Sequence, residues 1–344
     1  MDITNVKRVL IGQPFPNSQE IHERLDRVRG LAVFASDPIS SNAYATEAIM
    51  SVLVVLGSGA LRLTLPLALA VAALVLLVVF SYIQTIMHYP QGGGAYMVSK
   101  DNLGRYSSLV AAAALLSDYV LTVSVSVSAG VRAVTSALPE AYDYRVIIAL
   151  GAIGFITWMN LRGARESATV FAIPTYAFVG GVLLVILIGI LRKLELLGVA
   201  PLPDLHGTIE AEKDLAGLAY IWLLLRAFAG GCTALTGIEA ISDGVQAFKP
   251  PESRNAASTM VAMGVIAMTL FIGIAFLATT MHLVPTEHGE SILSQITRQI
   301  TGGGLLYYWV QVFTALILFL AANTGFQDFP RLSSFLARYG FMPR

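Results

Sequence analysis

Charged residues are scarce in this sequence. They make up 13% of its 344 residues, whereas 56% are hydrophobic, and the mean hydropathy is +0.70. This composition excludes an ordinary soluble protein and indicates an integral membrane protein. Lys plus Arg and Asp plus Glu number 22 each, so the formal net charge is zero. The orientation in the membrane therefore depends on where the charges lie.

Several functional signatures are also missing. The single cysteine, Cys232, excludes a disulfide within the chain, and no cluster of Cys or His suggests a metal site. The sequence has no G-x-x-x-x-G-K-[ST] loop for an ATP-driven pump and no His-Glu-x-x-His motif. Neither Asp37 nor Asp118 has the sequence context of an intramembrane aspartyl protease. The N-terminal residues contain no apolar core of the signal-peptide type. We therefore expect neither an enzyme nor a cleaved leader.

Eight stretches are long and apolar enough to cross a bilayer, which takes about 17 to 25 residues. They are expected at Leu31 to Leu56, Leu61 to Met87, Ser107 to Ala137, Arg145 to Leu161, Thr169 to Leu191, Leu218 to Asp243, Ala256 to Met281 and Leu305 to Asn323. An inner N-terminus places most basic residues inside and most loop acids outside. We expect an all-α polytopic protein of the plasma (inner) membrane with both termini cytoplasmic.

The first expected span is interrupted by Ser36-Asp37-Pro38-Ile39-Ser40-Ser41. Pro38 removes a backbone donor and frees carbonyls that lipid cannot satisfy, a device that transporters use to bind ions at a helix break. Asp37 is interpreted as a cation or proton ligand, and the alternative is that it only caps the helix that follows. Tyr44 lies two turns further along the same face, so its hydroxyl can point into the same cavity.

The third span carries a polar stripe. Asp118, Thr122 and Ser126 recur at steps of four residues on an otherwise apolar helix. An ionisable group at this depth needs a partner or a watery cavity. The two hydroxyls either line an ion site with Asp118 or simply bond to their own backbone.

The sixth span contains glycines and threonines close together between Gly230 and Glu239, and these residues are poor helix formers. We predict a second unwound segment there, with Thr236 and Glu239 on one face. Glu239 is interpreted as a proton carrier, and the alternative is a structural group bonded to loosened backbone. Arg226 is a counter-charge for Glu239, an outer-gate residue, or a side chain that reaches the membrane interface.

Two further segments allow more than one interpretation. The loop from Tyr89 to Tyr96 contains Gly92, Gly93 and Gly94, and it is either a flexible inner gate or a tight turn. Residues 18–29 form either a short helix on the membrane surface or a solvated leader.

The first and sixth spans share a weak sequence similarity. Thr46-Glu47-Ala48-Ile49 resembles Ile238-Glu239-Ala240-Ile241, which is a weak sign of an inverted repeat.

Five segments together resemble the amino acid-polyamine-organocation superfamily, and within it the KimA-type potassium/proton symporters. They are Phe34 to Ser41, Tyr44 to Glu47, Tyr89 to Tyr96, Asn160 to Gly163 and Cys232 to Ser242. The resemblance implies a LeuT/APC-type fold of two inverted five-helix repeats with broken first and sixth helices. It also implies proton-coupled potassium uptake, with potassium and protons as transported ions rather than cofactors.

The resemblance also assigns roles to residues. Asp37, Tyr44, Asp118, Thr122, Ser126 and Thr236 correspond to the ion site, with Asp37, Tyr44 and Thr236 nearest to the potassium ion, and Glu239 corresponds to the proton-coupling group. Glu47 receives no role. The implied partners are a small inorganic cation, the lipid bilayer and, for the full-length protein, a second copy in a homodimer, but no nucleic acid.

The resemblance divides the chain into four parts. They are a cytoplasmic segment (1–30), a first five-helix repeat (31–191), an extracellular loop (192–217) and a partial second repeat (218–344). The partial repeat consists of three helices and an inner loop, which is expected at Arg331 to Arg338. The second repeat is incomplete, because the chain reaches Arg344 after three of its five expected helices, as if truncated after the eighth span. We therefore expect a fragment of a longer transporter, or a chain that needs a partner. The later helices and a cytoplasmic domain that binds a cyclic dinucleotide lie outside these residues.

The main alternative is an amino acid permease of the same superfamily. Such a protein holds the substrate carboxylate on backbone amides at a glycine-rich break. Here the first break offers Asp37 and hydroxyls, which repel a carboxylate and attract a cation. A polyamine substrate stays possible, as does a membrane scaffold that does not transport.

Overall fold

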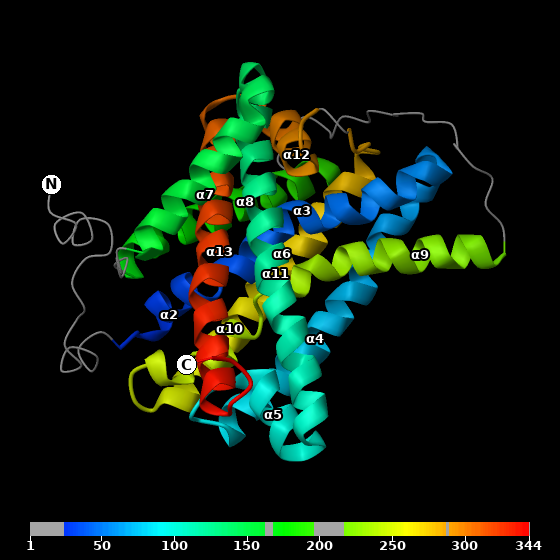
Figure 1. The fold of residues 1–344 in the computed structure, drawn as a ribbon. Helices are drawn as coiled ribbons and strands as arrows, with labels where there is room; N and C mark the ends of the chain where they lie inside the picture. Colours follow the sequence, from blue (N-terminus) through cyan, green and yellow to red (C-terminus); the bar gives the residue numbers. More distant parts are fainter. Residues whose placement is uncertain (1–23, 162–167, 196–216, 287–288, 344) are drawn as a thin grey trace, which may run out of the picture.

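The computed structural model describes residues 24–161, 168–195, 217–286 and 289–343. Within these ranges the chain is helical, and its only β-type pairing is an isolated bridge between Leu25 and Phe248. The α-helices are α2 (Arg27–Phe34), α3 (Ser36–Leu53), α4 (Thr64–His88), α5 (Gly94–Leu103), α6 (Arg105–Ala137), α7 (Arg145–Leu161), α8 (Ala168–Lys193), α9 (Leu218–Gly231), α10 (Ala240–Asp243), α11 (Glu252–Thr280), α12 (Ile292–Thr301) and α13 (Leu305–Arg338) (Figure 1). Half of the predicted surface segment at residues 18–29 lies outside the described residues. Most of the predicted loop at 192–217 lies outside them as well.

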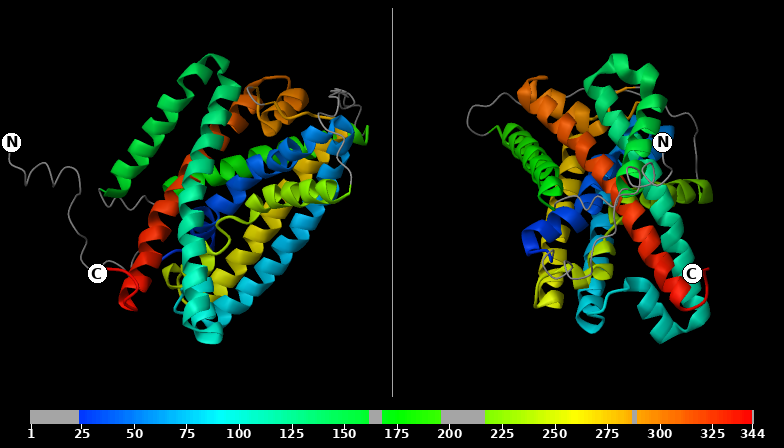
Figure 2. Two further views of the ribbon diagram at one scale, coloured as in Figure 1. Left: turned by 45° about the vertical axis from the view of Figure 1, so that its right-hand side comes forward. Right: turned by 60° about the vertical axis from the view of Figure 1, so that its left-hand side comes forward.

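The prediction of eight membrane spans is confirmed. In the described part of the chain, eight helical segments are long and apolar enough to cross a membrane, and all eight overlap the predicted stretches. Figure 2 shows α4 and α11 side by side, and residues of the two helices contact each other. The protein is therefore an all-α polytopic membrane protein. The division into two repeats stays a prediction.

The prediction for the end of the chain was wrong in one respect. We expected the last span to stop at Asn323 and Arg331 to Arg338 to form a loop, but α13 is one helix of 34 residues that runs to Arg338. Its extra turns are stabilised by tertiary packing, because Leu332 and Leu336 lie in a cluster with Ala112 and Tyr119 of α6. Sequence alone did not reveal this partner.

The break in the first span lies slightly earlier than predicted. The helix is interrupted at Ala35, where φ is −101° and ψ is 4°, and Ser36, Asp37 and Pro38 form the first turn of α3. Pro38 has no N–H for the carbonyl of Phe34, four residues before it, so regular helical bonding fails at this point. The membrane-spanning part consequently begins at Ser36 rather than Leu31.

The two ends of the bundle carry different short helices (Figure 1). We call the end with α5, α10 and the C-terminal turn of α13 the α5 end, and the end with α12 the α12 end. Neither α5 nor α12 was predicted from the sequence. Both connect long helices: α5 lies between α4 and α6, and α12 lies between α11 and α13.

Toward the α5 end, α2 is fixed to the segment that follows α10. Leu25 exchanges two backbone hydrogen bonds with this segment, from its own N–H to the carbonyl of Ala247 (2.8 Å) and from Lys249 N–H to its carbonyl (2.9 Å). Phe248 is fully buried and stacks on Phe34 with 5.5 Å between ring centroids. The short helices beside the two breaks therefore form one packed unit.

Gly30 allows this packing, because a Cβ placed there would lie 2.9 Å from Cζ of the Phe248 ring. We expect Gly30→Ala to lower the free energy of unfolding by about 1 to 3 kcal/mol, the usual cost of overpacking a core. The measurement is the midpoint of thermal unfolding in detergent, which should be lower for Gly30→Ala than for the wild type. Gly59→Ala is the matched control, since nothing lies within 4 Å of its added methyl group. Equal midpoints for both variants would contradict the packing argument.

Candidate ion-binding site

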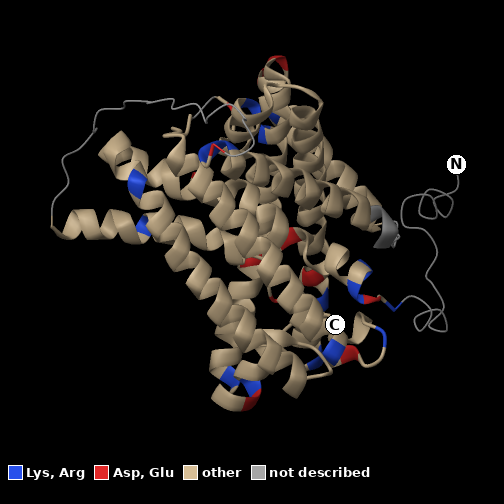
Figure 3. Cartoon of the chain, turned by 180° about the vertical axis from the view of Figure 1, so that it is seen from behind, with Lys and Arg blue, Asp and Glu red and all other residues tan. Residues whose placement is uncertain are grey.

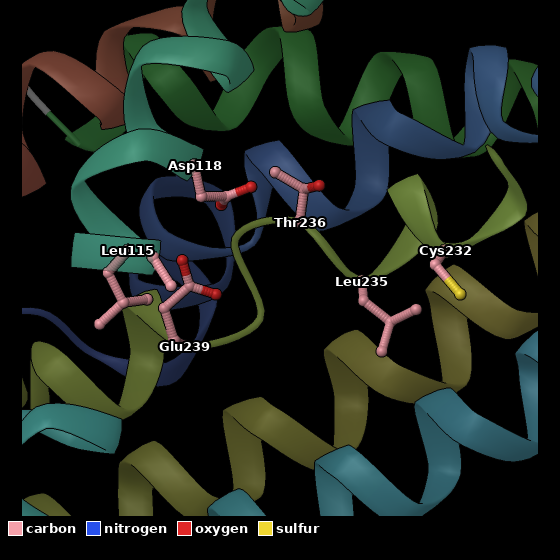
Figure 4. A pocket seen from close by; sticks show the side chains of 7 residues that line it. Leu115, Asp118, Cys232, Leu235, Thr236 and Glu239 are labelled. Carbon is pink, nitrogen blue, oxygen red and sulfur yellow. The ribbon is translucent and has the colours of Figure 1, made fainter. Parts of the chain in front are cut away.

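A cavity of about 350 Å³ lies where α6 faces the middle of the sixth span (Figure 4). It is lined by Ala114, Leu115 and Asp118 of α6 and by Cys232, Leu235, Thr236 and Glu239 of the sixth span. In the close-up, the side chains of Asp118, Thr236 and Glu239 point into the space between α6 and the unwound segment. Two predicted carboxyl groups and one predicted hydroxyl thus meet at one cavity.

The second break is confirmed. α9 ends at Gly231 and continues as a 3₁₀ turn, Cys232–Leu235. Thr236 is then extended, with φ −58° and ψ 131°, and Gly237 has φ +80°, a value that L-residues with side chains rarely adopt. The helix resumes only at Ala240, as α10. The unwound backbone places Thr236 and Glu239 at the cavity.

Asp37, at the first helix break, contacts the second helix break. Its side chain lies directly against Gly237: a Cβ on that glycine would be 2.5 Å from Asp37 Oδ2 and 2.8 Å from its Cγ. The residue is only 3% exposed. No side chain caps the N-terminus of α3, so capping does not explain a carboxyl group at this depth. The first break therefore presents an acidic side chain to the unwound segment of the sixth span.

Hydroxyl groups of α3 surround Asp37. Ser41 Oγ donates to the carbonyl of Asp37 (2.9 Å), lies 3.4 Å from Asp37 Oδ1, and lies 3.0 Å from the hydroxyl of Tyr44. Ser40 donates to the same carbonyl at 3.0 Å. Asn42 donates to the carbonyls of Pro38 and Ile39. These donors bond to carbonyls within α3, and the side-chain oxygens of Asp37, Ser41 and Tyr44 lie close together beside them.

Of the polar stripe of α6, Asp118 lines the cavity, whereas Thr122 and Ser126 do not. Thr122 and Ser126 are buried, and the Tyr44 hydroxyl approaches Ser126. Ser124 and Ser128 bond to their own helix, whereas the buried Ser126 Oγ has no hydrogen-bond partner among the described residues. Backbone bonding therefore does not account for Ser126, whose Oγ faces the Tyr44 hydroxyl.

The site is acidic without an obvious counter-charge. Asp37 interacts electrostatically with Asp118, and Glu239 with both of them. None of the ion pairs found between described residues involves these three acids. Figure 3 shows acidic segments inside the bundle, whereas basic segments lie mostly toward the ends of the helices. A buried group of carboxyls of this kind favours a bound cation or proton.

Three residues near the site were missed. Ser41 lies next to Asp37, and Asp243 and Asp328 extend the acidic group toward the α5 end, where Asp328 pairs with Arg331 at 3.0 Å. Asp243 follows Glu239 by four residues, a helical spacing that could have drawn attention to it. Asp328 gave no such signal, because the acids near it, Asp37 and Asp243, come from other helices.

The predicted gate residues lie in two different places. Arg226 is exposed on α9, and the structure does not bring it to Glu239. Gly92, Gly93 and Gly94 form a tight turn with positive φ before α5, and a Cβ on Gly92 would lie 2.5 Å from the carbonyl oxygen of Asp243. The glycine turn thus closes against the end of the sixth span.

Comparison with known proteins identifies the family of the chain. The family model described as amino acid permease matches residues 25–344, which include both breaks and α6. The chain belongs to this family. The chain is also 44% identical over 340 residues to the potassium transporter KimA of Bacillus subtilis. That alignment covers 99% of this chain and 55% of the relative, so the chain spans about half the length of the curated protein that it matches. Both descriptions name transport proteins rather than enzymes.

Proposed function

We propose that the protein is a secondary transporter that takes up potassium together with protons. The central observation is the contact between Asp37 and Gly237, which places a buried carboxyl group at the junction of the two helix breaks. Asp37, Tyr44 and Thr236 would be nearest to the potassium ion, with Asp118, Thr122 and Ser126 completing the site. The potassium transporter that is 44% identical supports the choice of cation.

Carboxylate and hydroxyl oxygens are the ligands that a hard cation prefers. An amino acid substrate would instead bring its carboxylate close to Asp37, which repels it. We propose that the protein lies in the cell membrane with the α12 end outside and the α5 end inside. This orientation follows the distribution of basic residues in the sequence.

The test is uptake by the protein at its full length in cells that lack their own potassium systems. We expect growth at low external potassium and uptake that amino acids and polyamines do not inhibit. Inhibition by an amino acid, without potassium uptake, would instead favour an amino acid permease. Expression without any uptake would favour a scaffold.

Glu239 is proposed as the proton-coupling residue. It is 8% exposed, has the three acids Asp243, Asp118 and Asp37 as neighbours, and borders the cavity, so a proton can neutralise it there. We expect Glu239→Gln to leave a slower potassium uptake that no longer depends on the pH gradient. The measurement is potassium-dependent acidification of proteoliposomes. A Glu239→Gln variant that still acidifies its vesicles would remove Glu239 from the coupling step.

A further inference from the structure

Three basic residues at the α5 end form no ion pair within the described ranges. Lys100 lies on α5, Arg105 is the first residue of α6, and Arg338 is the last residue of α13. Arg331, two turns before Arg338, is instead paired with Asp328 at 3.0 Å. We call Lys100, Arg105 and Arg338 the basic patch. Figure 3 shows basic segments at this end of the bundle, away from the acids of the ion site.

Each cation of the basic patch lies over an aromatic ring near the C-terminal end of α13. The three pairs, with the distance to the ring centroid, are Lys100 Nζ over Tyr339 (3.3 Å), Arg105 Cζ over Phe341 (4.7 Å) and Arg338 Cζ over Phe335 (5.7 Å). A ring attracts a cation through its quadrupole but does not cancel its charge, as a carboxylate would. The positive charge of the basic patch is therefore left for an anion.

The rings under the basic patch are held in place by packing. Phe335 and Phe341 contact a buried cluster formed by residues of α5, α6 and α13. The N–H of Phe341 donates to the carbonyl of Leu336 at 2.9 Å, which fixes the turn after α13. Tyr96 of α5 is fully buried, and its ring centroid lies 6.2 Å from that of Tyr339. The cations are thus positioned before any ligand binds, which lowers the entropy cost of binding.

The basic patch lies at the depth of lipid headgroups. α6 has 33 residues and α13 has 34, so each is about 50 Å long, whereas the hydrocarbon core of a bilayer is about 30 Å thick. Their terminal turns therefore extend into the headgroup region. Beside Arg105, the side chains of Tyr106 and Val110 lie one turn apart on α6 and are 85% and 71% exposed. Positive charge thus borders directly on an exposed apolar surface.

We propose that the basic patch binds the phosphate group of an anionic phospholipid, whose acyl chains lie along the exposed face of α6 that begins at Tyr106. Lys and Arg side chains donate charge-assisted hydrogen bonds to phosphate oxygens. Asp101 is exposed next to Lys100 and cancels one of the three positive charges, so the surface stays positive. In the proposed orientation the lipid belongs to the cytoplasmic leaflet, where anionic lipids attract basic residues. The site is separate from the ion site and can be tested without potassium.

The test is binding of fluorescent phosphatidylglycerol to the purified full-length protein in nonionic detergent, followed by fluorescence anisotropy. We expect saturable binding, and binding of phosphatidylcholine with the same acyl chains that is weaker by at least about tenfold, since its headgroup has no net charge. Equal affinities for the two lipids would overturn the proposal. So would the absence of phosphatidylglycerol binding, because other parts of the full-length protein would then cover the basic patch. Displacement of the lipid by an equal concentration of inorganic phosphate would also overturn it.

Variants of the basic patch locate the binding. A basic residue near the membrane surface contributes about a factor of five to binding, so Lys100→Gln combined with Arg105→Gln should weaken phosphatidylglycerol binding roughly 25-fold. Arg145→Gln is the matched control, because Arg145 Cζ also lies over a ring, 4.3 Å from the centroid of Tyr142, but at the opposite end of α6. Its affinity for the lipid should equal that of the wild type. Equal weakening in the control and in the double variant would contradict the site.

A charge-keeping variant separates electrostatic binding from a structural role. Lys100→Arg combined with Arg105→Lys preserves both positive charges and should bind phosphatidylglycerol with nearly wild-type affinity. If this variant loses binding as fully as the double Gln variant, the two side chains only hold the end of α13, and the proposal is wrong. Binding of the lipid by a protein that takes up no potassium would support the lipid site and reject the proposed substrate.

Discussion

Gly237→Ala is expected to reduce potassium uptake by at least about tenfold at potassium concentrations below saturation. The added methyl group would lie 2.5 Å from Asp37 Oδ2, so the carboxyl group must move away from the unwound segment. An alanine at φ +80° also costs about 1 to 2 kcal/mol in backbone energy, and about 1.4 kcal/mol corresponds to a factor of ten. The measurement is the initial rate of uptake, corrected for the amount of protein in the membrane.

Gly217→Ala is the matched control for this effect. Gly217 also has a positive φ, +62°, but nothing lies within 4 Å of the added methyl group. It therefore shares the backbone strain without the contact, and its uptake should stay close to that of the wild type. If both variants lose uptake equally, strain alone explains the loss. If Gly237→Ala transports normally, the contact between the two breaks has no role in transport.

Asp37→Asn should produce the largest loss of all. The amide keeps the shape of the side chain and can still face Ser41, but it removes the negative charge at the junction of the breaks. Interactions with a charged group contribute about 1.5 to 3 kcal/mol, which predicts a loss of roughly 10- to 150-fold in uptake at low potassium. Asp101→Asn, at an exposed position of α5, is the control and should transport normally. Growth at low potassium that is equal in the two variants would contradict the assignment of Asp37.

Much of the architecture could be predicted because membranes restrict what a sequence can do. Eight apolar stretches correspond to eight spans, and both helix breaks follow from local chemistry: Pro38 in the first span, Gly237 and its neighbours in the sixth. The four-residue steps of Asp118, Thr122 and Ser126 placed them on one face of α6. These signals are local, so a single sequence contains them.

The features that the sequence did not reveal depend on distant partners. Glu47 binds Ile292, which is 245 residues further along the chain. The last turns of α13 depend on packing against α6, and Asp328 joins the acidic group through other helices. α12 is a different case, because Ser291 is a good N-cap and the apolar residues after it have helical spacing. Its signal was present, but its amphipathic pattern is too short and too polar for a membrane span.

Transport as proposed here requires a cation that binds between the two helix breaks. The most direct test is potassium binding to the purified full-length protein, measured by isothermal titration calorimetry for the wild type, Asp37→Asn and Asp101→Asn. We expect saturable potassium binding in the wild type and in Asp101→Asn, and a loss of that binding in Asp37→Asn. Potassium binding of wild-type affinity in Asp37→Asn would contradict the proposed site.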